Sequence, residues 1–384
     1  FGSISDIDIV FNKYTVLIGK QGAGKSTIAK LYSMFTWLEK GLARRTVSDK
    51  YITQFSRFQK NYCAYHRLDS YFKTNTIIKF YGLHYNFFYE EGKLQIEEIE
   101  HQENYNVAKV MYVPAERNFL STVDNPMNLK NLPESLKTFL DEFENAKIVL
   151  KAGYQLPFNN IAFEYDAQHK ISWIKGEDYK IRLSDASSGY QSVIPLTLVT
   201  KFLSDLVQDN ANKEELGFQE RKQIEKEVNK VMNDKTLTEE VKFAMLRTIS
   251  SRFKYSRFVN IVEEMEENLY PESQMSILFD LLDYTNRIEL NRLVLTTHSP
   301  YIINYLTLAV KAFLLDRKVS GNDDLSSRIN EIVPLQSVVN PAKLLIYELK
   351  DGKAIQLSNY DGLPSDENFL NIQLGLTNEM FDQL

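Results

Sequence analysis

Near the start of the chain, the eight residues GKQGAGKS (19–26) match the pattern G-x-x-x-x-G-K-[ST] completely. The glycines of such a loop let backbone N–H groups curl around phosphate oxygens, and the N-terminus of the following helix adds a partial positive charge. We expect Lys25 to reach the β- and γ-phosphates, Ser26 to coordinate Mg²⁺ and Thr27 to bond an α-phosphate oxygen. The other predicted phosphate contacts come from Gly19, Gln21, Gly22, Ala23 and Gly24. The sequence therefore predicts binding of ATP with Mg²⁺.

Two adjacent carboxylates, Glu263 and Glu264, follow the apolar run FVNIV (258–262). A phosphate loop that hydrolyses its nucleotide needs an acid at the end of another strand, which holds Mg²⁺ through its water shell, and a group that positions the attacking water. Successive side chains of a strand point in opposite directions, so we assign Glu263 to Mg²⁺ and Glu264 to the water. An acidic helix N-terminus is the alternative, and the complete phosphate loop favours the catalytic interpretation.

Two more motifs offer polar groups to a phosphate. Ser187, Ser188 and Gly189 stand directly before an apolar helix, whose N-terminus attracts anions. His298 follows the apolar run LVLT, where its imidazole could bond the γ-phosphate. A serine–glycine turn is commonly only a helix cap, and a lone histidine is commonly structural. The order of phosphate loop, Ser-Ser-Gly, paired acids and histidine is that of ABC-type ATPases, and it favours one shared catalytic site in which Lys25, Glu264 and His298 act together.

Hydropathy predicts the elements that must position these motifs. Continuous apolar runs are typical of parallel strands covered on both faces, and they occur at 15–18, 110–113, 258–262 and 293–296. Alternating runs predict antiparallel hairpins that turn near Gly92 and at 351–352, with a third within 159–174. A periodic apolar face predicts a helix over 132–150, and residues 205–254 are predicted to form charged amphipathic helices.

These elements predict an α/β fold with a mixed central sheet, antiparallel β hairpins and a helical insertion, or lid, and the order of the motifs resembles that of a P-loop, ABC-type ATPase. We expect a single domain over residues 1–384. The insertion would be residues 205–254, between the Ser-Ser-Gly turn and the paired acids, and residues 300–384 would complete the domain.

Five motifs carry a resemblance to a known family: GKQGAGKST (19–27), MYVPAERNF (111–119), SSGYQ (187–191), EEMEENLYP (263–271) and TTHSP (296–300). On these motifs the chain resembles ABC-type ATPases of the SMC/RecF branch. It looks most like the ATPase domain of the overcoming-lysogenization-defect (OLD) group and related phage-defence ATPases, such as the ATPase subunit of PARIS-like two-component systems. The chain departs from the family pattern at Tyr190, where Gln or Glu is usual, and at Met265, where Pro is usual.

The resemblance implies a head-to-tail homodimer or a higher homo-oligomer. In such a dimer, Ser187 and Gly189 of one subunit would contact the γ-phosphate held by the phosphate loop of the other. Residues 268–271 would correspond to the D-loop that crosses the interface. Glu116 and Arg117 would be interface or sensor groups.

Three classes of function are compatible with these motifs. The first is a nucleotide-dependent sensor or scaffold in an anti-phage defence assembly. Only 86 residues follow His298, and we find no D-x-D cluster of a Toprim nuclease, so the effector, a nuclease or toxin, would be a separate chain. The alternative is a DNA-binding repair or structural ATPase of the RecF/SMC type. A transporter subunit is the third class, but its signature should stand close ahead of the paired acids, whereas a charged helical stretch separates them here.

Composition and charge favour a cytoplasmic protein without membrane association. The net charge is −6, with 43% hydrophobic and 25% charged residues, which is ordinary for a soluble domain. Residues 1–90 carry 13 Lys and Arg against 6 Asp and Glu, an excess compatible with DNA. No apolar run reaches the roughly 20 residues of a transmembrane helix. The lone cysteine, Cys63, is expected to be buried, and the five histidines offer no zinc-ligand spacing.

Overall fold

The computed structural model describes residues 1–384 except 45, 100–106, 212–217, 251–253, 320–321 and 384. The chain separates into two compact units, each assembled from distant stretches of sequence. The larger unit comprises Gly2–Ala29, Met111–Ser204 and Val259–Leu384, and the smaller unit comprises Phe1, Lys30–Val110 and Asp205–Phe258. All five sequence motifs fall in the larger unit. The assignment of residues 1–384 to a single domain stays a prediction.

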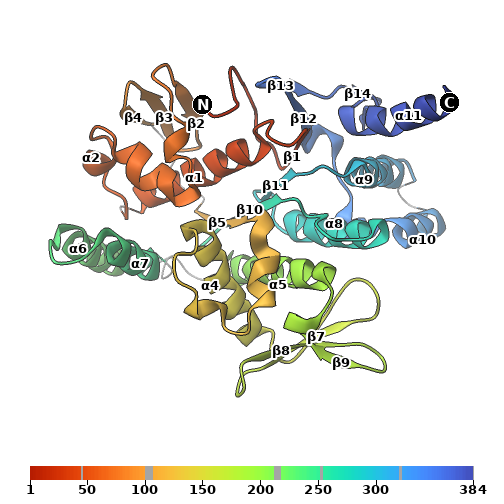
Figure 1. Cartoon of the computed structure of the whole chain (residues 1–384), viewed down its shortest axis with the longest axis horizontal. Coiled ribbons are helices and arrows are strands. Elements are labelled where there is room, and N and C mark those ends of the chain that lie inside the picture. The colour runs from red at the N-terminus through yellow and green to blue at the C-terminus, as the bar shows by residue number, and fades with distance from the viewer. Residues whose placement is uncertain (45, 100–106, 212–217, 251–253, 320–321, 384) are drawn as a thin grey trace. The chain divides into compact units, whose positions relative to one another are not determined.

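A six-stranded sheet in the order β13-β12-β1-β11-β10-β5 organises the chain (Figure 1). Its strands are β1 (Tyr14–Gly19), β5 (Ala108–Val113), β10 (Arg257–Glu263), β11 (Arg292–Thr296), β12 (Leu344–Lys350) and β13 (Lys353–Gln356). Strand β1 pairs in parallel with β11 and β12, β10 pairs in parallel with β11, and β12 pairs antiparallel with β13. This confirms the predicted mixed sheet, and the four continuous apolar runs are four of its strands.

Burial explains why these runs are apolar throughout. Every residue of β1 and of β10 is buried, as is usual for parallel strands that helices cover on both faces. Helix α8 (Pro271–Asn286) connects β10 to β11, and α9 (Pro300–Lys318) follows β11. Because β1, β10 and β11 are parallel, their carboxyl ends meet at one edge of the sheet. The segments that follow these strands carry the phosphate loop, the paired acids and His298.

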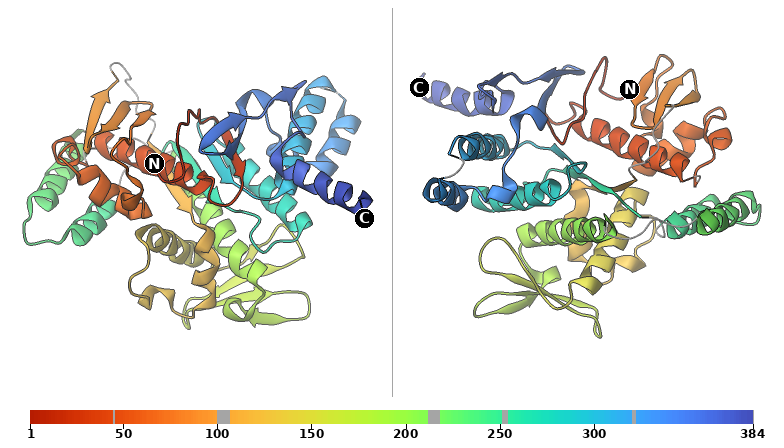
Figure 2. Two further views of the ribbon diagram at one scale, coloured as in Figure 1. Left: turned by 45° about the horizontal axis from the view of Figure 1, so that its top comes forward. Right: turned by 180° about the vertical axis from the view of Figure 1, so that it is seen from behind.

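The rest of the larger unit is helical or antiparallel. Helices α3 (Phe119–Thr122), α4 (Glu134–Val149), α5 (Ser188–Ala211), α10 (Asp323–Ile332) and α11 (Phe369–Asp382) belong mainly to it. A four-stranded sheet contains β6 (Tyr154–Gln155), β7 (Ala162–Asp166), β8 (Ile171–Lys175) and β9 (Lys180–Arg182), and β14 (Asn359–Tyr360) pairs with β15 (Leu363–Pro364). Figures 1 and 2 show strands β7–β9 on the far side of α4 and α5 from the central sheet. The predicted helix over 132–150 and the hairpin within 159–174 are confirmed.

The smaller unit has its own core. Most of helix α1 (Lys25–Ala43) packs there with α2 (Asp49–Ile52) and with the antiparallel strands β2 (Ile78–Tyr81), β3 (Tyr85–Glu90) and β4 (Lys93–Glu98). Buried Cys63 belongs to this core. Helices α6 (Phe218–Asn233) and α7 (Glu239–Ser250) pack against each other through a separate apolar cluster. The predicted helices within 205–254 are therefore present, whereas their role as a lid stays a prediction.

Short helical turns complete both units, at Phe58–Tyr62, Cys63–His66, Asp69–Tyr71, Ala115–Asn118 (η4), Pro126–Asn128 (η5), Leu183–Asp185 (η6), Leu335–Ser337 and Pro341–Lys343. In the part of the chain that the structure describes, no helix is both long and apolar enough to cross a bilayer.

Candidate functional site

The phosphate loop joins β1 to α1 in the predicted way. Strand β1 ends at Gly19 and helix α1 begins at Lys25, so Ser26 and Thr27 lie in the first turn of the helix. A side chain on Gly19 would place its Cβ atom 2.4 Å from the carbonyl oxygen of Leu349, which excludes any residue larger than glycine. Strand β12 thus fixes where the loop begins.

Lys25 folds back onto its own loop. Its Nζ atom donates hydrogen bonds to the carbonyl oxygens of Gly19 (2.8 Å) and Lys20 (3.1 Å), and it lies 3.0 Å from Nε2 of His298. Burial lowers the pKa of Lys25 to about 8. Among the described residues, the direct partners of this ammonium group are two carbonyl oxygens and an imidazole, and a phosphate would add an anion in direct contact with it.

Register in the sheet brings the paired acids next to this lysine. Thr296, the last residue of β11, is the partner both of Leu17 in β1 and of Glu263 in β10. The backbone N–H of Glu264 donates to the carbonyl oxygen of Thr296 at 2.9 Å. Oε1 of Glu264 lies 3.3 Å from Nε2 of His298. Lys25, His298 and Glu264 therefore form one contiguous group, and their joint action in catalysis stays a prediction.

The two glutamates differ in environment. Glu263 is buried, and its Oε1 atom makes no hydrogen bond within the described chain. Glu264 is half-buried, and its hydrogen bond with His298 holds the pKa of its carboxyl group below the usual range. Glu264 also has a φ of +43°, a left-handed conformation that is costly for a residue with a side chain. The backbone at this turn must therefore be held by its surroundings.

The enclosed oxygen of Glu263 is suited to a Mg²⁺ ion. A buried carboxylate oxygen without a partner is unfavourable, and a metal-bound water would satisfy it. The described residues contain no cluster of three or more His, Cys, Asp or Glu side chains that could hold a metal by itself. That Ser26 and Glu263 hold Mg²⁺ together with phosphate oxygens, as is usual for this ion, stays a prediction.

Sequence reasoning did not assign a role to Glu266, and the structure gives it one. Its Oε1 atom accepts hydrogen bonds from the hydroxyl of Thr297 (2.8 Å) and from the backbone N–H of His298 (2.7 Å). Glu266 thereby fixes the backbone that carries the imidazole. The repeated acids in EEMEE were the available signal, but only the fold distinguishes the roles of the individual carboxylates.

Arg117 is fully enclosed within the described chain, and the role of Arg117 and Glu116 as interface or sensor groups stays a prediction. Its guanidinium donates hydrogen bonds to the backbone carbonyl oxygens of Pro114 (3.2 Å), Ser192 (3.2 Å), Glu263 (2.7 Å) and Glu264 (2.8 Å). The carboxylate of Glu267 lies 3.7 Å away. A buried guanidinium is tolerated when its donors are satisfied in this way. Arg117 ties the turn after β10 to helix α5.

The Ser-Ser-Gly turn begins helix α5. Ser187 takes the N-cap position, since its carbonyl oxygen accepts a hydrogen bond from the N–H of Gln191 at 3.1 Å. A Cβ atom on Gly189 would lie 2.8 Å from the carbonyl oxygen of Asn268, so this turn packs against residues 268–271. Ser187 and Ser188 are exposed. Within the described part of the chain, neither hydroxyl bonds to the phosphate loop.

The unusual Tyr190 of this turn has local partners. Its ring stacks on Phe158 with centroids 6.1 Å apart, and its hydroxyl accepts a hydrogen bond from the side chain of Asn159 at 3.1 Å. The tyrosine therefore attaches the start of α5 to the loop between β6 and β7.

No protein-family model matches the sequence, and no curated protein matches it either. Among solved structures, the chain is similar to an SMC head domain from Thermotoga maritima, with 10% identity, 92% of each chain covered and a TM-score of 0.34. It is also similar to an SmcHead bound to the C-winged helix domain of ScpA, with 12% identity, 92% of this chain and 93% of that chain covered, and a TM-score of 0.35. Such distant similarity says nothing about activity. The resemblance to OLD and PARIS-like ATPases stays a prediction.

Proposed function

We propose that the chain binds ATP with Mg²⁺ and hydrolyses it to ADP and phosphate. One observation supports this function above the others: Lys25, His298 and Glu264 meet at the carboxyl edge of the sheet, directly after a complete phosphate loop. These three groups lie next to one another in space. The lysine provides a cation for phosphate, the imidazole provides a hydrogen-bond donor for a terminal phosphate oxygen, and the carboxylate provides an acceptor for water.

Each residue then has one task. Lys25 exchanges its carbonyl partners for phosphate oxygens, which are stronger acceptors. Glu264 is ionised because its pKa is lowered, and it accepts a hydrogen bond from the attacking water. His298 donates to the γ-phosphate, and Glu266 holds its backbone in place. Bound Mg²⁺, held by Ser26 and Glu263, would neutralise charge on the phosphate oxygens.

Replacing Glu264 by glutamine tests this function. The Glu264→Gln variant keeps the shape of the side chain and loses its charge, so ATP affinity should persist while turnover falls at least about a hundredfold. Phosphate release and equilibrium ATP binding are measured on the full chain. Glu331→Gln, an exposed position on α10, is the matched control. Normal turnover in Glu264→Gln would remove the water-positioning role.

We further propose that this ATPase acts as a nucleotide-dependent sensor or scaffold in an anti-phage defence assembly and controls a separate nuclease or toxin. The motif set shared with OLD and PARIS-like ATPases supports this role. The alternative, a DNA-binding repair or structural ATPase, is favoured by the basic excess of residues 1–90.

One preparation separates the two roles. The tagged Glu264→Gln protein is isolated from its host with ATP and Mg²⁺ and analysed by native mass spectrometry. A second polypeptide in fixed stoichiometry would support the defence role and identify the effector. A homo-oligomer that carries DNA and lacks a partner protein would support the repair or structural role.

A further inference from the structure

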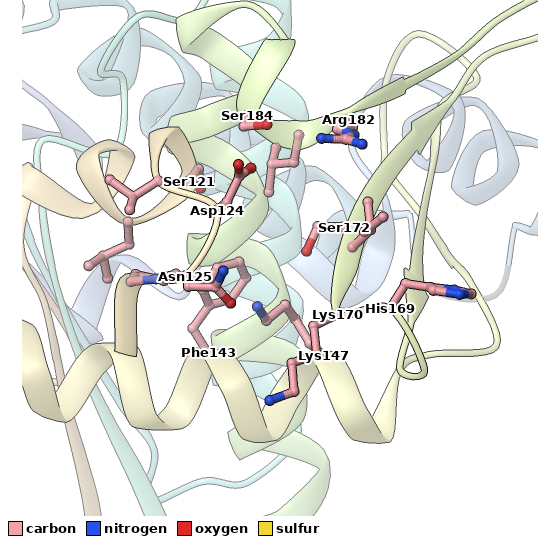
Figure 3. A pocket seen from close by; sticks show the side chains of 15 residues that line it. Ser121, Asp124, Asn125, Phe143, Lys147, His169, Lys170, Ser172, Arg182 and Ser184 are labelled. Atoms are coloured by element: carbon pink, nitrogen blue, oxygen red, sulfur yellow. The ribbon is translucent and has the colours of Figure 1, made fainter. Parts of the chain in front are cut away.

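A cavity of about 220 Å³ lies in the larger unit, and none of its lining residues belongs to the motifs described above (Figure 3). Its walls come from the segment of α3 and η5, from α4, from the β7–β8 hairpin and from β9 with η6. In Figure 3, Ser121, Asp124 and Asn125 lie across the cavity from Ser172 and Arg182. The proposed ATPase mechanism uses none of these residues.

Positive charge predominates in the lining of the cavity. Lys147, Lys170 and Arg182 contribute to the walls, against one carboxylate, Asp124. Lys147 already forms an ion pair with Glu144 at 2.6 Å. Within the residues that the structure describes, Lys170 and Arg182 have no such partner. A concave surface with excess positive charge attracts an anion.

A buried hydroxyl also faces the cavity without a partner. Ser121 is only 5% exposed, and its Oγ atom makes no hydrogen bond within the described chain. Buried hydroxyl groups are nearly always hydrogen-bonded, because leaving one unpaired is unfavourable. An oxygen of a bound ligand would provide the missing partner.

Apolar side chains also line the cavity, among them Leu120, Phe143 and Ile171. An inorganic anion would leave this apolar surface uncovered, whereas a ligand with an organic part would cover it. We propose that the cavity binds a small phosphorylated organic molecule. Its phosphoryl group pairs with Lys170 and Arg182, an oxygen bonds to Ser121, and the organic part covers the apolar wall.

The location of the cavity couples it to the ATPase site. The segment that carries Ser121 follows Arg117 directly, and Ser184, which also lines the cavity, lies three residues before Ser187 of the Ser-Ser-Gly turn. The side chain of Gln191 in α5 donates to the carbonyl oxygen of Ser184 at 2.9 Å. A ligand that orders these walls therefore alters the start of α5. This regulatory effect rests on the proposed ATPase function, whereas ligand binding itself does not.

Calorimetric titration of the full chain with phenyl phosphate tests the site. Replacing both Lys170 and Arg182 by alanine should weaken binding at least about tenfold, because two charge-assisted contacts are lost. The control carries alanine at Lys130 and Lys151, two exposed lysines outside the cavity, and its affinity should be unchanged. Any binding at the phosphate loop is common to both variants and cancels in the comparison. Equal affinities of the two variants would overturn the proposal.

Ser121→Ala provides a second measurement that does not depend on a large perturbation. Removing an unpaired buried hydroxyl should leave the melting temperature unchanged or raise it, while affinity for phenyl phosphate falls several-fold. Unchanged affinity would mean that water satisfies Ser121 and would overturn this contact.

Two competition experiments identify the source of the phosphate. Inorganic phosphate that binds as tightly as phenyl phosphate, with the same dependence on Lys170 and Arg182, would overturn the organic part of the proposal. A short DNA duplex that displaces phenyl phosphate from the cavity would overturn the assignment to a small molecule. Failure of both competitors, with phenyl phosphate still bound through Lys170 and Arg182, is the expected result.

Discussion

The left-handed turn at Glu264 places the carboxylate that we propose to be catalytic on a backbone conformation that is unfavourable for glutamate. Arg117 offsets this cost by bonding to the carbonyl oxygens of both Glu263 and Glu264 from a fully buried position. Arg117 cannot touch a nucleotide, so we regard it as a positioning residue. Its contribution should show in turnover and much less in nucleotide affinity, which depends on the phosphate loop.

Replacing Arg117 by methionine should lower kcat at least about tenfold and leave KM within about twofold, because Lys25 still binds the phosphates while Glu264 loses its fixed direction. Lysine at the same position should restore part of the loss by keeping one donor and the charge. Thermal unfolding confirms that each variant folds, with a destabilisation of about 3 kcal/mol expected for the broken network. Arg287→Met is the control, and normal kcat in folded Arg117→Met would contradict the positioning role.

At the residue level, the position of a side chain could be predicted from the sequence where the spacing of a motif alone sets it. The eight-residue phosphate loop fixes the backbone path, so the position of Lys25 could be predicted. The burial of Arg117, which lies in an equally distinctive motif, could not be predicted, because the sequence does not show which elements meet around a side chain. Burial by β5, β10 and α5 is a property of the fold, and only the fold reveals it.

At the scale of elements, helix α8 connects two loops of the site. The side chain of Gln274 accepts a hydrogen bond from the Ser299 hydroxyl at the start of α9 (2.7 Å) and donates one to the carbonyl oxygen of Leu269 (2.9 Å). Gln274 and Ser299 are both buried. The loop of His298 and the loop of residues 268–271 are therefore parts of one hydrogen-bonded arrangement.

A double-mutant cycle should reveal this connection. Gln274→Ala and Ser299→Ala should each reduce the free energy of unfolding by about 1–3 kcal/mol, since each leaves a buried polar group unpaired. The double variant should lose clearly less than the sum, with a coupling energy of at least about 0.5 kcal/mol. Urea unfolding of the four proteins gives these values. Strictly additive losses would show that the two side chains act independently.

Element-level prediction was strongest for the buried strands. Because β1 and β10 are buried on both faces, they stand out in the sequence as apolar runs. The turn of a hairpin is indicated by residues such as Gly92, whose φ is +79°. The sheet order could not be predicted in this way. Strand β1 pairs with β11 and β12, which lie more than 270 residues away, and local periodicity contains no information about partners so distant. The division into two units could not be predicted for the same reason, since each unit is assembled from discontinuous stretches of sequence.

At the scale of the whole molecule, the resemblance to ABC-type ATPases predicts that one chain does not form a complete site. Lys25, Glu264 and His298 form a group, whereas exposed Ser187 and Ser188 lie at the start of α5 without a bond to the phosphate loop. A head-to-tail homodimer would place the Ser-Ser-Gly turn of each subunit against the phosphate loop of the other. Ser187→Arg should then bind ATP normally but fail to hydrolyse it, because a large cation blocks the partner's nucleotide.

Mixing two inactive variants tests the shared site directly. In a dimer of one Ser187→Arg chain and one Lys25→Ala chain, one composite site contains both lesions and the other contains neither. Random assortment makes half of the dimers mixed, each with one intact site out of two, so ATPase activity should return to about one quarter of the wild-type rate. Activity is measured before and after the variants are mixed, and a mixture of Ser187→Arg with wild-type chain calibrates subunit exchange. A site built from a single chain would leave the mixed sample as inactive as its components.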